Sequence, residues 1–135
     1  MDLAATAKAA AEAIATASLD GRASAIGGSF FDPLPAGADA YVLSDILHNW
    51  DDARAGEILA GCARAADRNG CVLVIEQLRE QKADTAIDLF MLMCFGGRER
   101  TSAELSTLAA SCGLQWRSTT QAADYRTFLE FVVVR

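Results

Sequence analysis

Apolar positions recur at intervals of three and four residues in three stretches of this chain, and this spacing predicts three helices. A fourth helix is predicted over 85–95, a stretch dense in apolar residues that the Gly96-Gly97 pair ends. The first is rich in alanine, which predicts close packing, and Gly21 is placed to end it. The last along the chain begins with a capping box, Thr101 with Glu104, and is closed by Gly113. The predicted helices cover about 3–18, 51 or 52 to 67, 85–95 and 101–113.

Short apolar and β-branched runs predict five strands, over 22–29, 40–43, 71–78, 114–119 and 128–134. The third is nearly all apolar, as expected for a strand buried on both faces. The presence of one charged residue in this strand, Glu76, therefore requires an explanation. The last two form an expected antiparallel pair, because their link is too short and polar for a crossover helix. Strands and helices alternate before that pair, which predicts an α/β fold with an open sheet and an antiparallel end.

The only histidine, His48, follows the predicted strand over 40–43 and precedes a predicted helix start. Open α/β sheets bind ligands at this end of their strands. Because the unperturbed pKa of imidazole lies near neutrality, His48 is a candidate general base that takes a proton from a hydroxyl group. A hydrogen-bonded loop histidine is the alternative interpretation.

Composition narrows the function classes. The net charge is −6 and the 12 Lys and Arg residues are scattered among acidic ones, which opposes binding to nucleic acid or to a membrane surface. The apolar runs are too short to span a bilayer and the N-terminus lacks a signal-peptide pattern, so the expected location is the cytoplasm. The cysteines lack paired spacing, which predicts reduced core residues and, with one histidine, no metal site. They are Cys62, Cys71, Cys94 and Cys112.

Three segments, taken together, resemble motifs of the S-adenosylmethionine-dependent O-methyltransferases that act on plant phenols and bacterial polyketides. Residues 27–35, Gly-Gly-Ser-Phe-Phe-Asp-Pro-Leu-Pro, are similar to that family's adenine-contacting loop. Residues 47–52, Leu-His-Asn-Trp-Asp-Asp, are similar to its catalytic histidine motif, and residues 96–101, Gly-Gly-Arg-Glu-Arg-Thr, to its Gly-Gly-basic-Glu-Arg-Thr turn. The resemblance covers essentially all 135 residues.

The resemblance implies an incomplete Rossmann-like methyltransferase sheet, mostly parallel with an antiparallel C-terminal strand pair. Residues 1–135 would form a partial catalytic domain that binds cofactor and substrate. The family's first strand, its glycine-rich loop and its helical dimerisation domain have no counterpart in this sequence. S-Adenosylmethionine would be the cofactor, and a small aromatic or polyketide-like hydroxyl compound the acceptor.

The resemblance also assigns roles to single residues. His48 would be the base, with Glu76 and Glu99 flanking it to orient the imidazole and stabilise its cation. The residues that would bind the cofactor are Asp2, Ser29, Phe30 and Ser44. The residues that would contact the acceptor are Asn49, Phe90, Met93 and Cys94. The family usually has an acidic residue at the position of Ser29, whose hydroxyl is a weaker acceptor for the adenine amino group.

Several of these assignments have a plainer alternative. Asp2 can cap the first helix, and Asp51 and Asp52 the second. Glu76 can be a solvated strand end and Glu99 a surface turn residue. Ser29 and Phe30 can be ordinary loop residues, and the methionines can be plain core, since an apolar helix face more often packs than lines a pocket.

A second function class stays open, a noncatalytic interaction module. The family's first two strands lie centrally in its sheet, between those that correspond here to 24–26 and 41–43. Without them, unpaired strand edges are expected to pair with another copy or a partner. The sequence therefore predicts a homo-oligomer.

Overall fold

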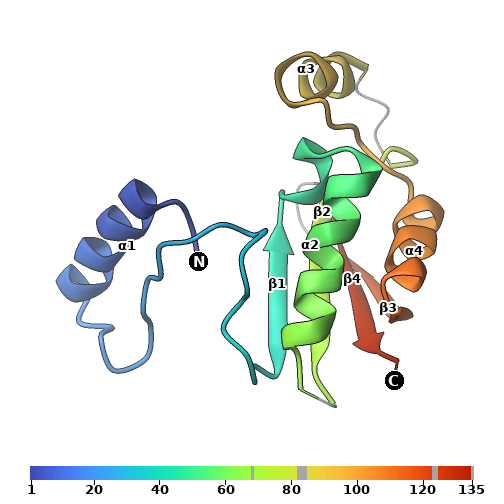
Figure 1. The fold of residues 1–135 in the computed structure, drawn as a ribbon. Helices are drawn as coiled ribbons and strands as arrows, with labels where there is room; N and C mark the ends of the chain where they lie inside the picture. Colours follow the sequence, from blue (N-terminus) through green and yellow to red (C-terminus); the bar gives the residue numbers. More distant parts are fainter. Residues whose placement is uncertain (68, 82–84, 123–124, 135) are drawn as a thin grey trace. The chain divides into compact units, whose positions relative to one another are not determined.

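A computed structural model describes residues 1–67, 69–81, 85–122 and 125–134 of the chain (Figure 1). The chain divides into two compact units, Met1–Leu34 and Pro35–Arg135. Among the described residues, no helix has both the length and the apolar character that crossing a membrane requires.

The first unit contains helix α1 (Ala4–Thr16), which confirms the first predicted helix. The helix ends earlier than expected, because Ser18 adopts a left-handed conformation with φ of 56° before Gly21 is reached. Ala7 is its one buried residue, and Leu3 is 68% exposed. The predicted close packing is therefore wrong for most of this helix.

The predicted strand over 22–29 is also wrong. The structure shows a single parallel bridge between Asp2 and Gly27. The Asp2 N–H donates to the Ile26 carbonyl at 3.0 Å, and the Gly28 N–H donates to the Asp2 carbonyl at 2.9 Å. A strand needs a paired neighbour along its length. Within this unit the described residues provide that pairing only at Asp2.

The second unit holds a four-stranded sheet of order β1-β2-β4-β3. Its strands are β1 (Ala40–Ser44), β2 (Cys71–Gln77), β3 (Leu114–Gln121) and β4 (Arg126–Val133). Strands β1 and β2 run parallel, whereas β4 is antiparallel to both β2 and β3. This mixed sheet confirms the predicted α/β fold with an antiparallel C-terminal strand pair.

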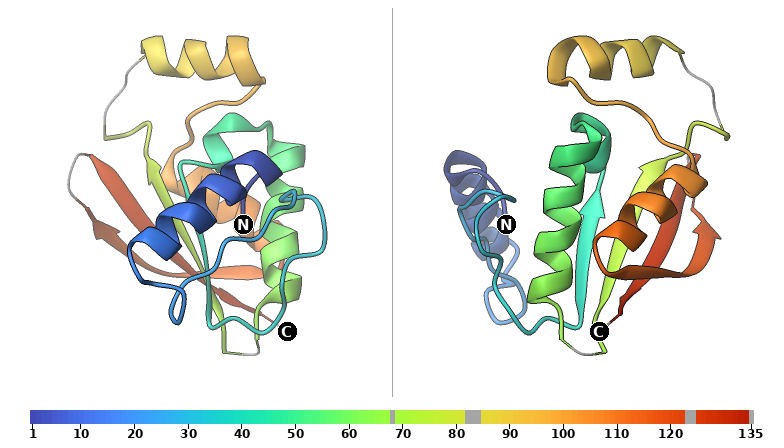
Figure 2. Two further views of the ribbon diagram at one scale, coloured as in Figure 1. Left: turned by 90° about the vertical axis from the view of Figure 1, so that its left-hand side faces the viewer. Right: turned by 45° about the vertical axis from the view of Figure 1, so that its right-hand side comes forward.

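Helices α2 (Asp52–Ala65) and α4 (Ser102–Ser111) lie side by side on one face of this sheet (Figures 1 and 2). Every second residue of β2 and β4 points into that face, where Val72, Val74 and Leu129 are fully buried. The other face of β2 is only half-buried, so the predicted burial on both faces holds for one face alone.

Local capping signals place both helices. The Asp51 side chain accepts a 2.8 Å hydrogen bond from the Arg54 N–H at the start of α2. Thr101 and Glu104 form the predicted capping box of α4, and Gly113, with φ of 79°, follows its end. Both predicted helix starts are confirmed.

Helix α3 (Thr85–Phe95) lies beyond the carboxyl ends of β1 and β2 (Figure 1). It contacts the short 3₁₀ helix η1 (Leu47–Asn49), but its apolar side chains are largely exposed. The exposed ones are Leu89, Phe90, Leu92, Met93 and Phe95. Cys94 is exposed as well, so its predicted core position is wrong, whereas Cys62 is buried as expected.

Candidate functional site

The chain turns sharply between the end of β1 and helix η1, and this turn carries His48. Asp45 adopts a left-handed backbone conformation with φ of 53° at the turn. Its N–H donates to the Ile75 carbonyl of β2 at 2.9 Å, which ties the turn to the neighbouring strand. His48 is therefore placed at the carboxyl end of the parallel strand pair, where open α/β sheets bind ligands.

Glu76 is the buried acid beside this turn. It alternates with Val72 and Val74 on the helix-covered face of β2, and only 3% of it is exposed. Its Oε1 accepts two backbone hydrogen bonds, from Ile46 at 3.1 Å and from Leu47 at 2.8 Å. The alternation of side chains along β2 thus explains why this one charged residue is buried. The two N–H groups offset part of the free energy that burying its carboxylate costs.

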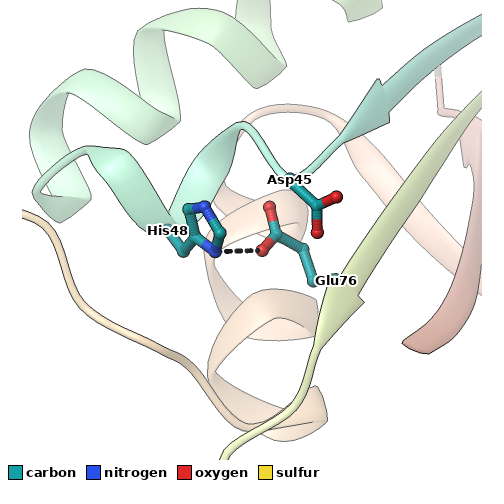
Figure 3. A group of neighbouring side chains, drawn as sticks. All are labelled: Asp45, His48 and Glu76. Atoms are coloured by element: carbon teal, nitrogen blue, oxygen red, sulfur yellow. Dashed lines mark ion pairs between the residues drawn. The ribbon is translucent and has the colours of Figure 1, made fainter. Parts of the chain in front are cut away.

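The other oxygen of Glu76 faces the imidazole (Figure 3). Oε2 lies 3.2 Å from Nδ1 of His48, whose side chain is 16% exposed. A carboxylate that accepts a hydrogen bond from Nδ1–H fixes the ring and its tautomer, and leaves Nε2 as the nitrogen that can accept a proton. The pair has the arrangement of a base and the acid that orients it.

Burial keeps the imidazole neutral. Desolvation lowers the pKa of His48 below its usual value, the carboxylate of Asp45 opposes this, and the guanidinium groups of Arg100 and Arg126 add to it. A histidine whose pKa is lowered is unprotonated at neutral pH. His48 is therefore in the form that accepts a proton.

Burial also raises the pKa of Glu76 to about 7. The backbone N–H groups of Leu47, His48 and Ile46 lower this pKa, and the carboxylate of Asp45 raises it further. The folded chain then holds a proton on Glu76 at pH values where the unfolded chain has released it. The contribution of Glu76 to the free energy of unfolding therefore falls as pH rises from about 4.5 to about 7.

Replacing Glu76 with glutamine removes this titration. We expect the stability of Glu76→Gln relative to the wild type to rise by about 3 kcal/mol between pH 4.5 and pH 7.5, since one pKa unit corresponds to about 1.4 kcal/mol. Urea unfolding at both pH values measures the difference. The exposed Glu57 provides the control Glu57→Gln, whose relative stability should not change. A constant difference between Glu76→Gln and the wild type would contradict the raised pKa.

Asp45 is a site residue that the sequence reasoning missed. Its carboxylate lies with His48 and Glu76 in one cluster, and its Oδ2 forms a 2.6 Å ion pair with Nη2 of Arg126 in β4. Its position three residues before His48 and two residues after a predicted strand was a signal that it belongs to the same turn. The contact with Arg126 joins residues 81 positions apart. It could not be predicted without knowing how the strands pair in the folded sheet.

This cluster has the side chains of a possible cation site. One ligand atom each from Asp45, His48 and Glu76 lies within 4.8 Å of the others. Three of the four carboxylate oxygens already have a protein partner: Oε1 of Glu76 accepts from Ile46 and Leu47, Oε2 faces Nδ1 of His48, and Oδ2 of Asp45 pairs with Arg126. Those donors satisfy the oxygens as a cation would, so the arrangement favours an acid–base role.

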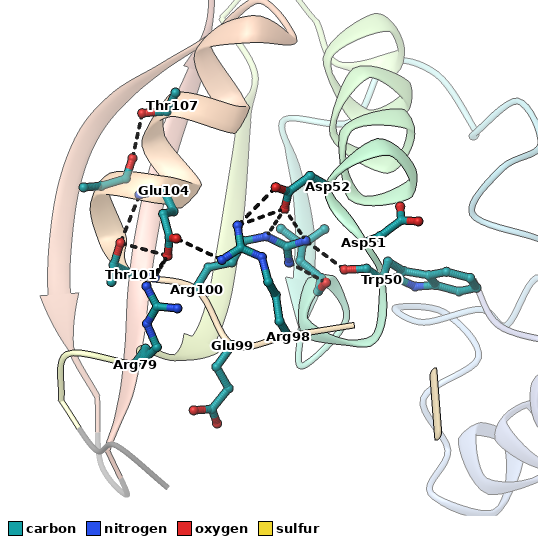
Figure 4. Close-up of polar contacts among 12 residues, drawn as sticks. Trp50, Asp51, Asp52, Arg79, Arg98, Glu99, Arg100, Thr101, Glu104 and Thr107 are labelled. Atoms are coloured by element: carbon teal, nitrogen blue, oxygen red, sulfur yellow. Dashed lines mark hydrogen bonds and ion pairs between the residues drawn. The ribbon is translucent and has the colours of Figure 1, made fainter. Parts of the chain in front are cut away.

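The turn over 96–101 packs directly against the backbone that carries His48. A Cβ atom placed on Gly97 would lie 2.0 Å from the His48 carbonyl oxygen and 2.5 Å from the Asn49 carbonyl carbon. Only glycine permits this approach. The next residues of the turn form a polar network with the start of α2 (Figure 4), in which Arg98 pairs with Asp52 at 3.1 Å and with Glu104 at 2.9 Å.

Glu99, the third predicted catalytic residue, belongs to the same turn and is buried, with 2% exposed. Its N–H donates to Asp88 of α3 at 2.8 Å. Its carboxyl group points away from the ion pairs of Arg98 and Arg100 in Figure 4. Its burial removes the alternative of a solvated surface residue, and its contact with the base stays a prediction.

The predicted acceptor residues lie on two elements. Asn49 belongs to η1, and its side chain donates to the Asp45 carbonyl at 3.2 Å. Phe90 and Met93 on α3 are 54% and 77% exposed, and Cys94 is exposed too. Their exposure rules out the alternative that these residues of α3 are plain core within the described chain.

The predicted cofactor residues are divided between the two units. In the first unit, Asp2 is exposed, its backbone is held by the bridge to Gly27, and its Oδ1 accepts the Leu3 N–H at 2.7 Å. The N-cap of α1 is Leu3, and no side chain caps this helix, so the alternative that Asp2 is its cap is wrong. Ser29 and Phe30 follow in the adjacent loop and are half-buried. In the second unit, Ser44 is exposed at the end of β1.

The family model of the O-methyltransferase domain matches residues 1–115 of this chain. A 2,7-dihydroxy-5-methyl-1-naphthoate 7-O-methyltransferase of Streptomyces carzinostaticus is 52% identical over 119 residues, which are 87% of this chain and 36% of that protein. An aclacinomycin 10-hydroxylase of Streptomyces purpurascens is 40% identical over 146 aligned positions, covering 99% of this chain and 39% of that protein.

A solved structure matches this chain as well. An O-methyltransferase from neocarzinostatin biosynthesis, in complex with S-adenosylmethionine and 2-hydroxy-5-methyl naphthoic acid, has a TM-score of 0.92 at 48% identity, over 98% of this chain and 40% of that one. The chain therefore spans 36 to 40% of the length of these three proteins.

Proposed function

Because this chain belongs to the O-methyltransferase domain family, we propose that it transfers a methyl group from S-adenosylmethionine to a hydroxyl of a small aromatic or polyketide-like acceptor, with His48 as the general base. The observation that carries the proposal is the 3.2 Å contact between Nδ1 of His48 and the buried Glu76. It leaves Nε2 free of the carboxylate and ready to accept a proton.

The chemistry follows from this geometry. A neutral hydroxyl is a weak nucleophile, and a base within hydrogen-bond distance increases the charge on its oxygen as the new bond forms. S-Adenosylmethionine, when bound, supplies an electrophilic methyl group on a sulfonium. His48 takes the hydroxyl proton on Nε2, and Glu76 stabilises the imidazolium that results. Because His48 becomes positively charged in this step, the buried Glu76 at hydrogen-bond distance stabilises it more strongly than it stabilises the neutral ring.

Four residues are proposed to hold the cofactor. Asp2, with its exposed carboxylate on a backbone held by the bridge to Gly27, would bind the ribose hydroxyls. Phe30 would stack on the adenine, and Ser29 would accept from its amino group. The Ser29 hydroxyl already accepts the Phe31 N–H at 3.3 Å, which leaves it a second lone pair for this contact. Ser44 would contact the cofactor from the end of β1.

The acceptor is proposed to be flat and aromatic. Phe90, Met93 and Cys94 offer exposed apolar or polarisable surface on α3, which contacts η1, the helix of His48. Asn49 on η1 would orient the acceptor, and Glu99 would flank the base. The naphthoate compounds named for the relative from Streptomyces carzinostaticus and for the neocarzinostatin enzyme have this shape. We also propose a cytoplasmic location, where the free cysteines stay reduced.

A chimera tests the proposed function. This chain replaces the matching third of the naphthoate 7-O-methyltransferase, so that the rest of that protein supplies the regions this chain does not match. We expect the chimera to add one methyl group to the dihydroxy naphthoate, detected by mass spectrometry, with the unaltered relative as the control. A chimera that folds and binds S-adenosylmethionine in calorimetry, yet transfers no methyl group, would overturn the proposal.

A second function is favoured by one observation. Within the part of the chain that the structure describes, strand β1 is one of the two edge strands of the sheet, and Val42 on it is 56% exposed. An exposed edge with an apolar side chain can pair with a second copy of the chain. An inactive chimera, together with a concentration-dependent dimer of the 135-residue chain in light scattering, would favour this interaction module over the enzyme.

A further inference from the structure

Arg100 is the buried cation of the turn over 96–101, and only 3% of it is exposed. Its Nη1 donates to the Leu47 carbonyl and its Nη2 to the Trp50 carbonyl, both at 2.8 Å. Its Nε donates to Asp52 at 2.9 Å. Leu47 and Trp50 flank the segment of His48, so one guanidinium group bonds to the backbone on both sides of the base. Figure 4 shows Arg100 beside Trp50 and Asp52.

Leu47 is held from two directions. Its N–H donates to Glu76 at 2.8 Å and its carbonyl accepts from Arg100 at 2.8 Å. Glu76 is also the acid that faces His48. The position of the imidazole relative to its acid therefore depends on a peptide segment that Glu76 and Arg100 hold together.

For these two backbone contacts, the planar arrangement of the guanidinium donors matters more than the positive charge. Arginine presents rigid, planar donors at fixed spacing, whereas lysine is a point charge on a flexible stem. Two carbonyls three residues apart, at Leu47 and Trp50, are bonded simultaneously by Nη1 and Nη2. A lysine would keep the charge and lose one or both of these directed bonds.

We propose that Arg100 is a positioning residue for the base: by holding the carbonyls of Leu47 and Trp50, it keeps Nδ1 of His48 on Glu76 and Nε2 available to the acceptor. The inference rests on the proposed function, in which His48 is that base. The close approach of Gly97 to the His48 carbonyl comes from the same turn and restricts the same segment independently.

The test uses the fact that His48 is the only histidine of the chain. The 135-residue chain is labelled with ¹⁵N-histidine, and its two imidazole nitrogens are recorded by NMR at pH 8. In the wild type we expect one tautomer, protonated on Nδ1. In Arg100→Lys we expect a mixture of tautomers, because the segment no longer holds the ring against Glu76.

Arg98→Lys is the matched control. Arg98 lies in the same turn and pairs with side chains of Asp52 and Glu104, while the bonds to Leu47 and Trp50 come from Arg100. This control should keep the wild-type tautomer. Circular dichroism shows that each variant is folded. If Arg100→Lys unfolds, Arg100→Gln replaces it, because its single amide nitrogen on a shorter side chain cannot bond to both carbonyls, and the same mixture of tautomers is expected.

In the chimera, Arg100→Lys should lower kcat on the order of 10²-fold and leave KM for S-adenosylmethionine unchanged, because a misplaced base slows only the chemical step. A folded Arg100→Lys variant with the wild-type tautomer would overturn the inference. That outcome is separate from failure of the proposed function, which an inactive chimera shows even when the tautomer depends on Arg100.

Discussion

Replacing His48 with glutamine is expected to slow methyl transfer by the chimera by about 10²- to 10⁴-fold, the usual contribution of a positioned general base. Glutamine has a similar reach but takes up no proton near neutral pH. The binding of S-adenosylmethionine should be unchanged, because His48 is proposed to act on the acceptor. Rates at saturating cofactor and calorimetric binding measure the two effects.

The matched control for this experiment is Arg54→Gln, on the exposed surface of α2. It should keep the wild-type rate. The rate of the wild type should also rise with pH through the lowered pKa of His48, since only the unprotonated ring accepts a proton. A His48→Gln chimera with the rate of the wild type would contradict the role of His48 as the base.

Replacing Gly97 with alanine is expected to reduce the free energy of unfolding by about 3 kcal/mol, the upper range for forcing extra volume into a packed region. The new Cβ would lie 2.0 Å from the His48 carbonyl oxygen and 2.7 Å from the Trp50 nitrogen. Both are backbone atoms, so a side-chain rotation cannot relieve the overlap. Urea unfolding of the 135-residue chain measures the loss.

Gly96→Ala separates this overlap from ordinary glycine effects. Gly96 has a positive φ of 73°, but a Cβ there would meet no heavy atom within 4 Å. Its expected loss is about 1 kcal/mol, from backbone strain alone. If Gly97→Ala proved no more destabilising than Gly96→Ala, the turn over 96–101 would not press on the segment of His48.

Elements with local signals could be predicted closely. The capping box of Thr101 and Glu104 involves residues three apart, and the start of α4 matches the prediction. The apolar runs of β1 and β2 were equally clear. The segment over 22–29 has a strand-like composition, yet it forms one bridge at Gly27, because a strand depends on a neighbour that composition does not reveal.

The candidate site was predicted only in part. The position of His48 after a strand, and the unexplained charge of Glu76, both pointed to the carboxyl end of the sheet. The resemblance of the turn over 96–101 to a known motif marked Glu99 but assigned no role to Arg100. Asp45 was overlooked as a partner, because its ion pair with Arg126 forms across strands that are distant in sequence.

The sequence by itself determined which segments fold as helices and strands in the second unit, and it singled out His48, because capping, periodicity and residue type act over a few neighbours. Only the tertiary structure decided that Glu76 meets Nδ1 of His48 and that Arg100 holds the backbone on both sides of it. Those contacts join residues 28 and about 50 positions apart, and their distances depend on how β1, β2 and the turn over 96–101 pack against one another.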